Sequence, residues 1–167
     1  MNKFLKINFQ ISSIVFLILL AVLSRLIPHP PNFTPIAGIA IFAANKINNK
    51  QIAILLPLIC LFISDLFIGF SLISFFVYFS FVVISLSSVY LKINTLHKVF
   101  LGSGLFFVIS NFGVWIIEYP LSLDGFIKCY FLAIPFYLNT LFGDLFYTFS
   151  LFISFRFATK YFYTLVR

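Results

Sequence analysis

Charged residues are scarce in this chain. Only 9% of the 167 residues are charged, four residues are acidic and 62% are apolar. A soluble domain carries charge on about a quarter of its residues. Too little polar surface is available to cover a particle in water, so the sequence excludes a soluble globular domain. It predicts an integral membrane protein whose solvent is the lipid bilayer.

The short motifs of several catalytic classes are also absent. The sequence has no G-x-x-x-x-G-K-[ST] phosphate loop, no nucleophile elbow and no histidine zinc motif. Cys60 and Cys129 form no close pair and lie far from His29, so neither a disulfide nor a zinc site is predicted. The net charge is +7, but the basic residues are scattered singly along the chain, so the charge does not indicate nucleic-acid binding. We expect no enzyme, cofactor or metal, and any pumping would take its energy from a partner or a gradient.

Long apolar runs between short polar breaks are typical of helices that cross a membrane. The apolar–polar alternation of a transmembrane β-barrel is missing, and backbone groups in lipid must be satisfied within their own segment. We therefore predict an all-α transmembrane six-helix bundle in one domain, covering 1–167. Prolines at 28–31 end the first span, and Pro135 is expected to separate a lead-in helix from the last span. The predicted spans are about 9–27, 35–45, 51–70, 71–91, 99–117 and 138–157, with the lead-in helix at about 124–134.

The basic residues predict an orientation, because cytoplasmic loops collect Lys and Arg. Segment 35–45 is short for a full crossing, since about eleven residues rise only about 16 Å, and a re-entrant loop is the alternative. If it crosses, nine of the eleven basic residues share one side: Lys3, Lys6, Lys46, Lys50, Lys92, Lys98, Arg156, Lys160 and Arg167. The others and all four acids fall toward the outside: Arg25, Lys128, Asp65, Glu118, Asp124 and Asp144. We predict a bacterial inner (cell) membrane protein with both termini cytoplasmic.

Two stretches of the chain resemble each other. ISDLFIGFSL at 63–72 aligns with FGDLFYTFSL at 142–151, and Asp, Leu, Phe, Phe, Ser and Leu coincide. In a six-span arrangement these stretches lie in the third and sixth helices, which run in opposite directions, as two inverted three-helix halves would require. A chance match between Phe- and Leu-rich segments is the alternative.

Arg25, Asp65 and Asp144 are ionisable side chains within predicted spans. Each costs on the order of a few kcal/mol in lipid, so each marks a partner, a pathway or a binding site. One interpretation is a structural Arg–Asp pair that satisfies itself. The other is that one carboxylate orients Arg25 while the other carboxylate faces a ligand.

Helical spacing gathers further polar groups. Asn111, Trp115 and Glu118 share one helix face, and Thr140, Asp144 and Tyr147 share another. These groups suit a planar, polar heterocycle, although Trp and Tyr also serve as interfacial anchors. The predicted substrate-binding residues are Arg25, Asn32, Asp65, Asn111, Trp115, Asn139 and Asp144.

Segment 35–45 is rich in small residues. Ala37, Ala40 and Ala44 line one face, with Gly38 and Ala43 beside it. Such faces allow helix backbones to approach closely in lipid. The neighbour is either another helix of this chain or a partner subunit.

Four strings carry a family resemblance: RLIPHPPNFTPIAG at 25–38, SDLFIGF at 64–70, SNFGVW at 110–115 and AIPFYLNTLFGDLFYT at 133–148. They resemble a bacterial family of small, uncharacterised membrane proteins that is treated as a transporter group similar to the substrate-binding S components of energy-coupling factor (ECF) vitamin transporters. The resemblance spans residues 25 to 148.

This resemblance implies a subunit that binds a vitamin-like small molecule from the outer side. Its partners would be an ECF-type coupling subunit and two ATPases. S components usually dock through an alanine-rich face on helix one, whereas here that face lies on 35–45 and the first span carries only Ala21 and Ser24. The alternative function is a non-transporting membrane scaffold or accessory subunit, whose polar residues only hold the helices together.

Overall fold

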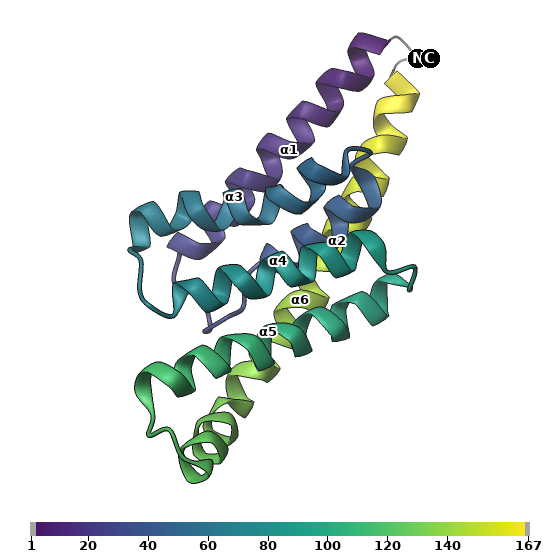
Figure 1. Cartoon of the computed structure of the whole chain (residues 1–167). Helices are drawn as coiled ribbons and strands as arrows, with labels where there is room; N and C mark the ends of the chain where they lie inside the picture. The colour runs from purple at the N-terminus through teal and green to yellow at the C-terminus, as the bar shows by residue number, and fades with distance from the viewer. Residues whose placement is uncertain (1–2, 166–167) are drawn as a thin grey trace.

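The structure, a computed structural model, describes the backbone of residues 3–165 and the side chains of residues 12–160. Over this range the chain forms six helices and no strand, which confirms the predicted all-α class and the count of six (Figure 1). In chain order the helices are α1 (Lys3–Leu26), α2 (Ile36–Lys46), α3 (Lys50–Ile68), α4 (Ser74–Tyr90), α5 (Thr95–Glu118) and α6 (Leu123–Leu165).

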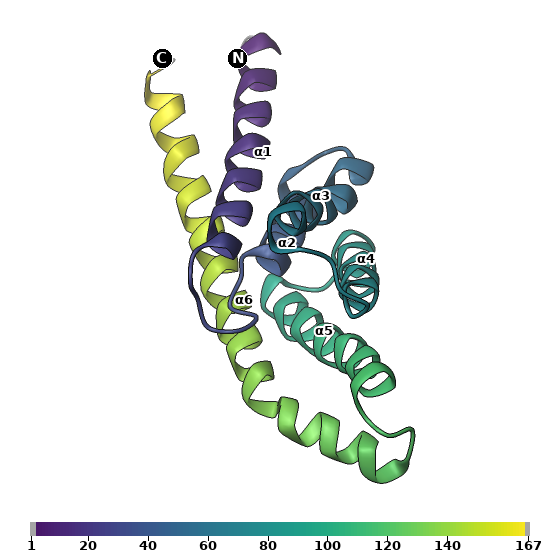
Figure 2. The ribbon, with the colours of Figure 1, turned by 90° about the vertical axis from the view of Figure 1, so that its left-hand side faces the viewer.

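The last helix differs from the prediction. The sequence predicts a break at Pro135, but α6 runs without interruption through this proline from Leu123 to Leu165. Proline removes one backbone donor and crowds the preceding turn, and a long helix can absorb both effects by bending. α6 curves along its length, and its first part turns beneath the other helices (Figure 2). The lead-in helix 124–134 and the span 138–157 are therefore one element.

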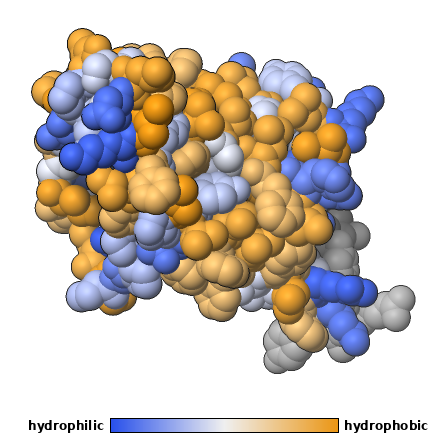
Figure 3. Space-filling view, turned by 90° about the horizontal axis from the view of Figure 1, so that it is seen from below, coloured by the Kyte–Doolittle hydropathy of each residue, from blue (hydrophilic) through white to orange (hydrophobic). Residues whose placement is uncertain are grey.

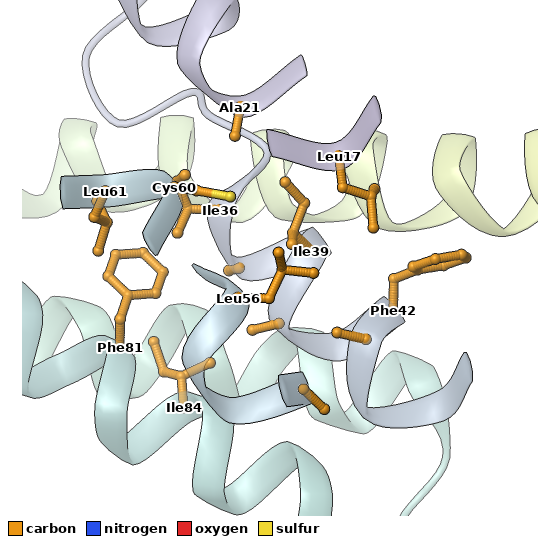
Figure 4. Packing of buried hydrophobic residues seen from close by; sticks show 14 of the residues in the cluster. Leu17, Ala21, Ile36, Ile39, Phe42, Leu56, Cys60, Leu61, Phe81 and Ile84 are labelled. Atoms are coloured by element: carbon orange, nitrogen blue, oxygen red, sulfur yellow. The ribbon is translucent and has the colours of Figure 1, made fainter. Parts of the chain in front are cut away.

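The shortest helix, α2, lies at the centre of the bundle. It contacts α3, α4, α5 and α6, and residues 36–43 are all buried. Ile39 of α2 and Leu56 of α3 point toward each other, with Leu17 of α1 and Ile84 of α4 close by (Figure 4). A helix that is apolar on every side is stable only when other elements cover it. This central position explains the hydrophobicity of a segment of only 11 residues.

The small residues of α2 face the chain's own helices. Ala37, Ala40 and Ala43 are buried. A Cβ added at Gly38 would lie 3.0 Å from the backbone nitrogen of Thr148 on α6. Between the two predicted neighbours, another helix of the chain or a partner subunit, the structure therefore selects the internal one.

Much of the outer surface is apolar. Large hydrophobic side chains are exposed on every helix except the central α2, among them Phe16, Phe67 and Phe157. On the face seen from below, hydrophobic residues cover most of the middle, and hydrophilic residues gather toward its two edges (Figure 3). Over the residues whose side chains are described, three helices are long and apolar enough to cross a membrane: Lys50–Ile68, Thr95–Glu118 and Leu123–Lys160. The shorter apolar stretches of that range are Ile36–Lys46, Ser74–Tyr90 and Ser12–Leu26, which is the described part of α1.

Basic residues collect at one end of the bundle. The α2–α3 and α4–α5 turns lie at the same end as the start of α1 and the finish of α6 (Figure 1). The ammonium of Lys46 lies over two rings of α6, and that of Lys50 lies 4.9 Å from the ring centroid of Tyr90. Lys98 is buried, and its Nζ donates to the Ser88 carbonyl at 2.6 Å. Arg167 lies outside the described residues, and the side chains of Lys3 and Lys6 lie outside those described.

The opposite end carries the α1–α2, α3–α4 and α5–α6 connections (Figure 1). Glu118 and Asp124 flank the last of these, and Asp65 lies near the end of α3. Asp144 is an exception, because it lies near the middle of the 43-residue α6 and contacts Ser103, in the first half of α5. The expectation that every acid lies toward this end is thus corrected for Asp144. The cause is that α6 is unbroken from Leu123, so that Asp144 lies 21 residues after its start, well away from the α5–α6 connection.

The helix packing does not follow the predicted inverted repeat. Asp65 and Asp144 do lie on helices that run in opposite directions (Figure 1). However, α1 packs against α3 and α2 packs against α6, whereas their counterparts under the repeat, α4 with α6 and α3 with α5, are not among the extensive contacts of the described residues. The two aspartates also have different partners, as described below.

Two asparagines fix the starts of helices at the basic end. The Asn49 side chain accepts from the backbone N–H of Gln51 at 2.9 Å and of Ile52 at 3.2 Å, and Asn94 accepts from the N–H of His97 at 2.9 Å. These bonds satisfy N–H groups that have no partner within the helix. They explain why α3 and α5 begin just beyond short polar turns.

Replacing Asn49 with alanine is expected to lower the free energy of unfolding by about 1 kcal/mol, since the helix start loses its cap. Asn48→Ala is the matched control, because Asn48 is an exposed neighbour that lies outside the capping position. Thermal unfolding of both variants in detergent measures the difference. Equal stability of the two variants would contradict the capping role.

Candidate functional site

A cavity of about 320 Å³ lies between the helices, beneath the α1–α2 loop. We call it the central cavity. One part of its lining is polar and comes from α1, the loop and α6: Arg25, His29, Asn32, Thr34, Thr140 and Asp144. The rest is apolar and includes Leu61, Phe81 and Phe106. An apolar pocket with a few converging polar groups is the usual form of a small-molecule site.

Arg25 and Asp65 form an ion pair at the edge of this cavity. Arg25 Nη1 lies 2.7 Å from Asp65 Oδ1, and their side chains are 17% and 6% exposed. The same nitrogen donates to the Ser64 hydroxyl and to the Leu61 carbonyl at 3.3 Å. Tyr78 donates its hydroxyl to Asp65 Oδ2 at 2.9 Å. Both oxygens of Asp65 are therefore occupied, and this carboxylate holds the guanidinium in place.

Asp144 lies apart from this pair. It is 3% exposed, and the Ser103 hydroxyl donates to its Oδ2 at 2.6 Å. Its other oxygen, Oδ1, has no hydrogen-bond partner among the described residues, and the side chain lines the central cavity. Both sequence-based interpretations contain an Arg–Asp pair, and the structure shows it between Arg25 and Asp65. The second interpretation adds that the other carboxylate faces a ligand, and Asp144 lines the central cavity.

A second cavity of about 270 Å³ adjoins the first, and we call it the side cavity. The two cavities share Asn32, Val77 and Phe106. Asn111 lines the side cavity, while its amide nitrogen donates to the Phe107 carbonyl at 2.7 Å. Asn32 has a positive φ of 64°, a conformation that asparagine tolerates better than most residues. This backbone turn places Asn32 where both cavities meet.

The α1–α2 loop rests directly on α6. The Phe33 ring packs at 5.9 Å from Phe146 and 5.6 Å from Tyr147, measured between centroids. A Cβ at Gly143 would lie 3.0 Å from the Phe33 Cα, so a larger residue would push the loop away by a few tenths of an ångström. The loop residues of the central cavity are therefore held by packing against the helix that carries Asp144.

Residues 5–165 match a family described as being of unknown function, DUF6580. The chain belongs to DUF6580. No curated protein and no solved structure matches it. The DUF6580 description names no activity.

The cavities contain four of the seven residues predicted for substrate binding. Arg25, Asn32 and Asp144 line the central cavity, and Asn111 lines the side cavity. Asp65 acts behind them by pairing with Arg25.

The other two predicted residues line neither cavity. Trp115 donates its indole N–H to the Pro120 carbonyl at 3.1 Å and packs edge-on against Phe126 at 5.2 Å, so it stabilises the α5–α6 connection. Asn139 is half-buried on α6 outside both linings. Helical spacing correctly placed Asn111 and Trp115 on one face of α5. Along that face Asn111 lines the side cavity, whereas Trp115, one turn later, contacts the α5–α6 connection.

Several cavity residues were missed by the sequence prediction. Thr140 carried a signal, since it precedes Asp144 by one helical turn. His29 and Thr34 carried none, because loop residues have no periodicity from which a facing direction can be inferred. Ser103 lines neither cavity, but its hydrogen bond to Asp144 was also missed, because this bond depends on how α5 packs against α6.

Proposed function

We propose that this chain is a membrane transport protein, the substrate-binding subunit for uptake of a vitamin-like micronutrient from the outer side. The observation that carries the proposal is the central cavity, in which a buried carboxylate and an oriented guanidinium face a space of about 320 Å³. In membrane proteins, buried ionisable groups around a cavity commonly mark a substrate pathway.

The proposed orientation rests on the two ends of the bundle. Lysines and arginines gather at the end that carries the α2–α3 and α4–α5 turns, which favours a cytoplasmic location for that end and for both termini. The central cavity lies beneath the α1–α2 loop, at the opposite end. A solute arriving from outside the cell would therefore meet the cavity first, and a bacterial inner membrane fits this direction of uptake.

The proposed kinship with ECF S components has a consequence for partners. The small-residue face of α2 is covered by the chain itself, through its contact with α6. A coupling subunit with its ATPases would have to dock on another face, and exposed apolar residues on α1 such as Phe16 and Leu19 offer one. Docking to an energising module is thus proposed through α1, the helix that S components use.

The second candidate is a non-transporting membrane scaffold. It is favoured by the extent to which Arg25, Asp65 and Tyr78 satisfy one another. A scaffold would not depend on an open cavity. A substitution that fills the cavity should therefore abolish ligand binding by a transport protein but leave a scaffold unaffected.

Uptake and binding of labelled vitamins, measured in cells that express the chain and with the purified protein, test the proposal. We expect at least one vitamin to bind, and Val77→Phe to abolish its binding, because Val77 lines both cavities and the larger ring would fill them. Val82→Phe, on the same helix but in neither lining, is the matched control. Absence of binding across the panel, or equal binding by the two variants, would contradict the proposal.

A further inference from the structure

The charges around the central cavity do not cancel. The Arg25 guanidinium is paired with Asp65 at 2.7 Å, so these two charges neutralise each other. The hydrogen-bond partner of Asp144 is the neutral Ser103 hydroxyl, and no cation pairs with Asp144 among the described residues. With Asp144 ionised, these three side chains therefore carry one negative charge in excess.

A buried carboxylate without a counter-charge is costly, and a cation placed beside it removes that cost. Asp144 Oδ1 is the acceptor that remains available, and the side chain lines the cavity from the middle of α6. An anionic ligand would meet this carboxylate, and the charge of the one arginine in the described lining is already paired with Asp65. The electrostatics thus favour a ligand with a positively charged N–H group.

The remaining walls describe the rest of the ligand. Leu61, Ile36 and Ala37 offer an apolar surface. The rings of Phe81 and Phe106 both line the cavity, and their centroids lie 5.4 Å apart. Aromatic faces attract cations as well as flat apolar groups. A volume of about 320 Å³ is at the small end of ligand pockets, which lie between about 300 and 1,000 Å³.

We propose that the central cavity binds a small organic cation, with its protonated nitrogen donating to Asp144 and its apolar or aromatic body against the adjoining rings of Phe81 and Phe106. Thr140 lies one turn before Asp144 on α6 and supplies a second oxygen to the same part of the lining. This inference rests on the proposed function, because both need the central cavity to be the substrate site. It goes further by stating the charge class of the substrate.

The first experiment compares ligands and needs no variant. Pyridoxamine and pyridoxine differ only in an aminomethyl in place of a hydroxymethyl group, and so form a matched cation and neutral pair. Thiamine is a cation whose charged nitrogen carries no hydrogen, so it tests the charge without the N–H donor, and biotin and pantothenate are anionic probes. Binding of each to the purified full chain is measured by calorimetry at neutral pH. We expect a cationic probe to bind, with pyridoxamine about tenfold or more tighter than pyridoxine if this pair is accepted.

The second experiment removes the charge. Asp144→Asn is expected to weaken binding of the cationic probe about tenfold or more while keeping the shape of the side chain. Asp124→Asn removes an exposed acid of the same helix and should leave binding unchanged. Thermal unfolding of both variants checks that they are folded. If the Asp144→Asn variant does not fold, the comparison of cationic, neutral and anionic probes on the wild-type protein tests the inference.

Three outcomes would overturn the inference. Tighter binding of a neutral or anionic probe would do so while leaving the proposed uptake function intact. Unchanged cation binding by a folded Asp144→Asn variant would have the same meaning. Binding of no probe in the panel would contradict both the inference and the proposed function.

Discussion

Replacing Arg25 with leucine is expected to lower the free energy of unfolding by about 3 to 5 kcal/mol. The substitution removes the cation that lies 2.7 Å from Asp65 and leaves a carboxylate with a side chain only 6% exposed. The hydrogen bond from Tyr78 remains, but a neutral hydroxyl cannot replace a full opposite charge. Unfolding of the purified protein in detergent, followed by circular dichroism, measures the loss.

A double-mutant cycle separates the ion pair from the general effect of removing an arginine. Arg25→Leu together with Asp65→Leu should recover most of the stability, because no buried charge is then left unpaired. Arg156→Leu is the control, since Arg156 is exposed on α6 and its removal should change stability by less than about 0.5 kcal/mol. An Arg25→Leu variant as stable as Arg156→Leu, or a double variant less stable than either single one, would contradict the pairing.

This ion pair marks how far the sequence can predict the site. An arginine within an apolar segment needs a carboxylate, so a pair between Arg25 and an aspartate was foreseeable. The choice between Asp65 and Asp144 was not, because it depends on α1 packing against α3 while α6 lies across the bundle. The sequence around the two aspartates is similar, yet Asp65 pairs with Arg25 and Asp144 accepts from Ser103.

The same limit applies to the helix bounds. Hydrophobic length and polar breaks predicted the number of helices and most of their ends, since both follow from local composition. Pro135 was expected to interrupt the last segment, yet the helix continues through it with a bend. Whether proline breaks or bends a helix depends on the helices that pack around it, which a local pattern does not contain. As a result Asp144 lies deeper than the sequence indicated.

Small residues gave a clearer signal, since they predicted a close helix contact before any neighbour was known. The structure identifies the neighbour as α6, whose backbone at Tyr147 and Thr148 lies close to Gly38. This contact also positions Thr140 and Asp144, which lie one turn apart on α6, relative to Ala37 on α2. All three residues line the central cavity. Stability and the geometry of the central cavity therefore depend on the same crossing.

Gly38→Leu is expected to lower the free energy of unfolding by about 3 kcal/mol, because overpacking a tight contact forces the backbones apart. A Cβ at Gly38 would already lie 3.0 Å from the Thr148 nitrogen and 3.2 Å from the Tyr147 backbone carbon, and backbone atoms cannot rotate away. Gly104→Leu is the matched control on α5, where an added Cβ meets no atom within 4 Å. That variant should match the wild type or exceed it, since leucine favours a helix more than glycine does. Equal unfolding temperatures of the two variants would show that the α2–α6 contact can loosen at little cost. A selective loss for Gly38→Leu would identify this crossing as the one that holds α2 in the centre of the bundle.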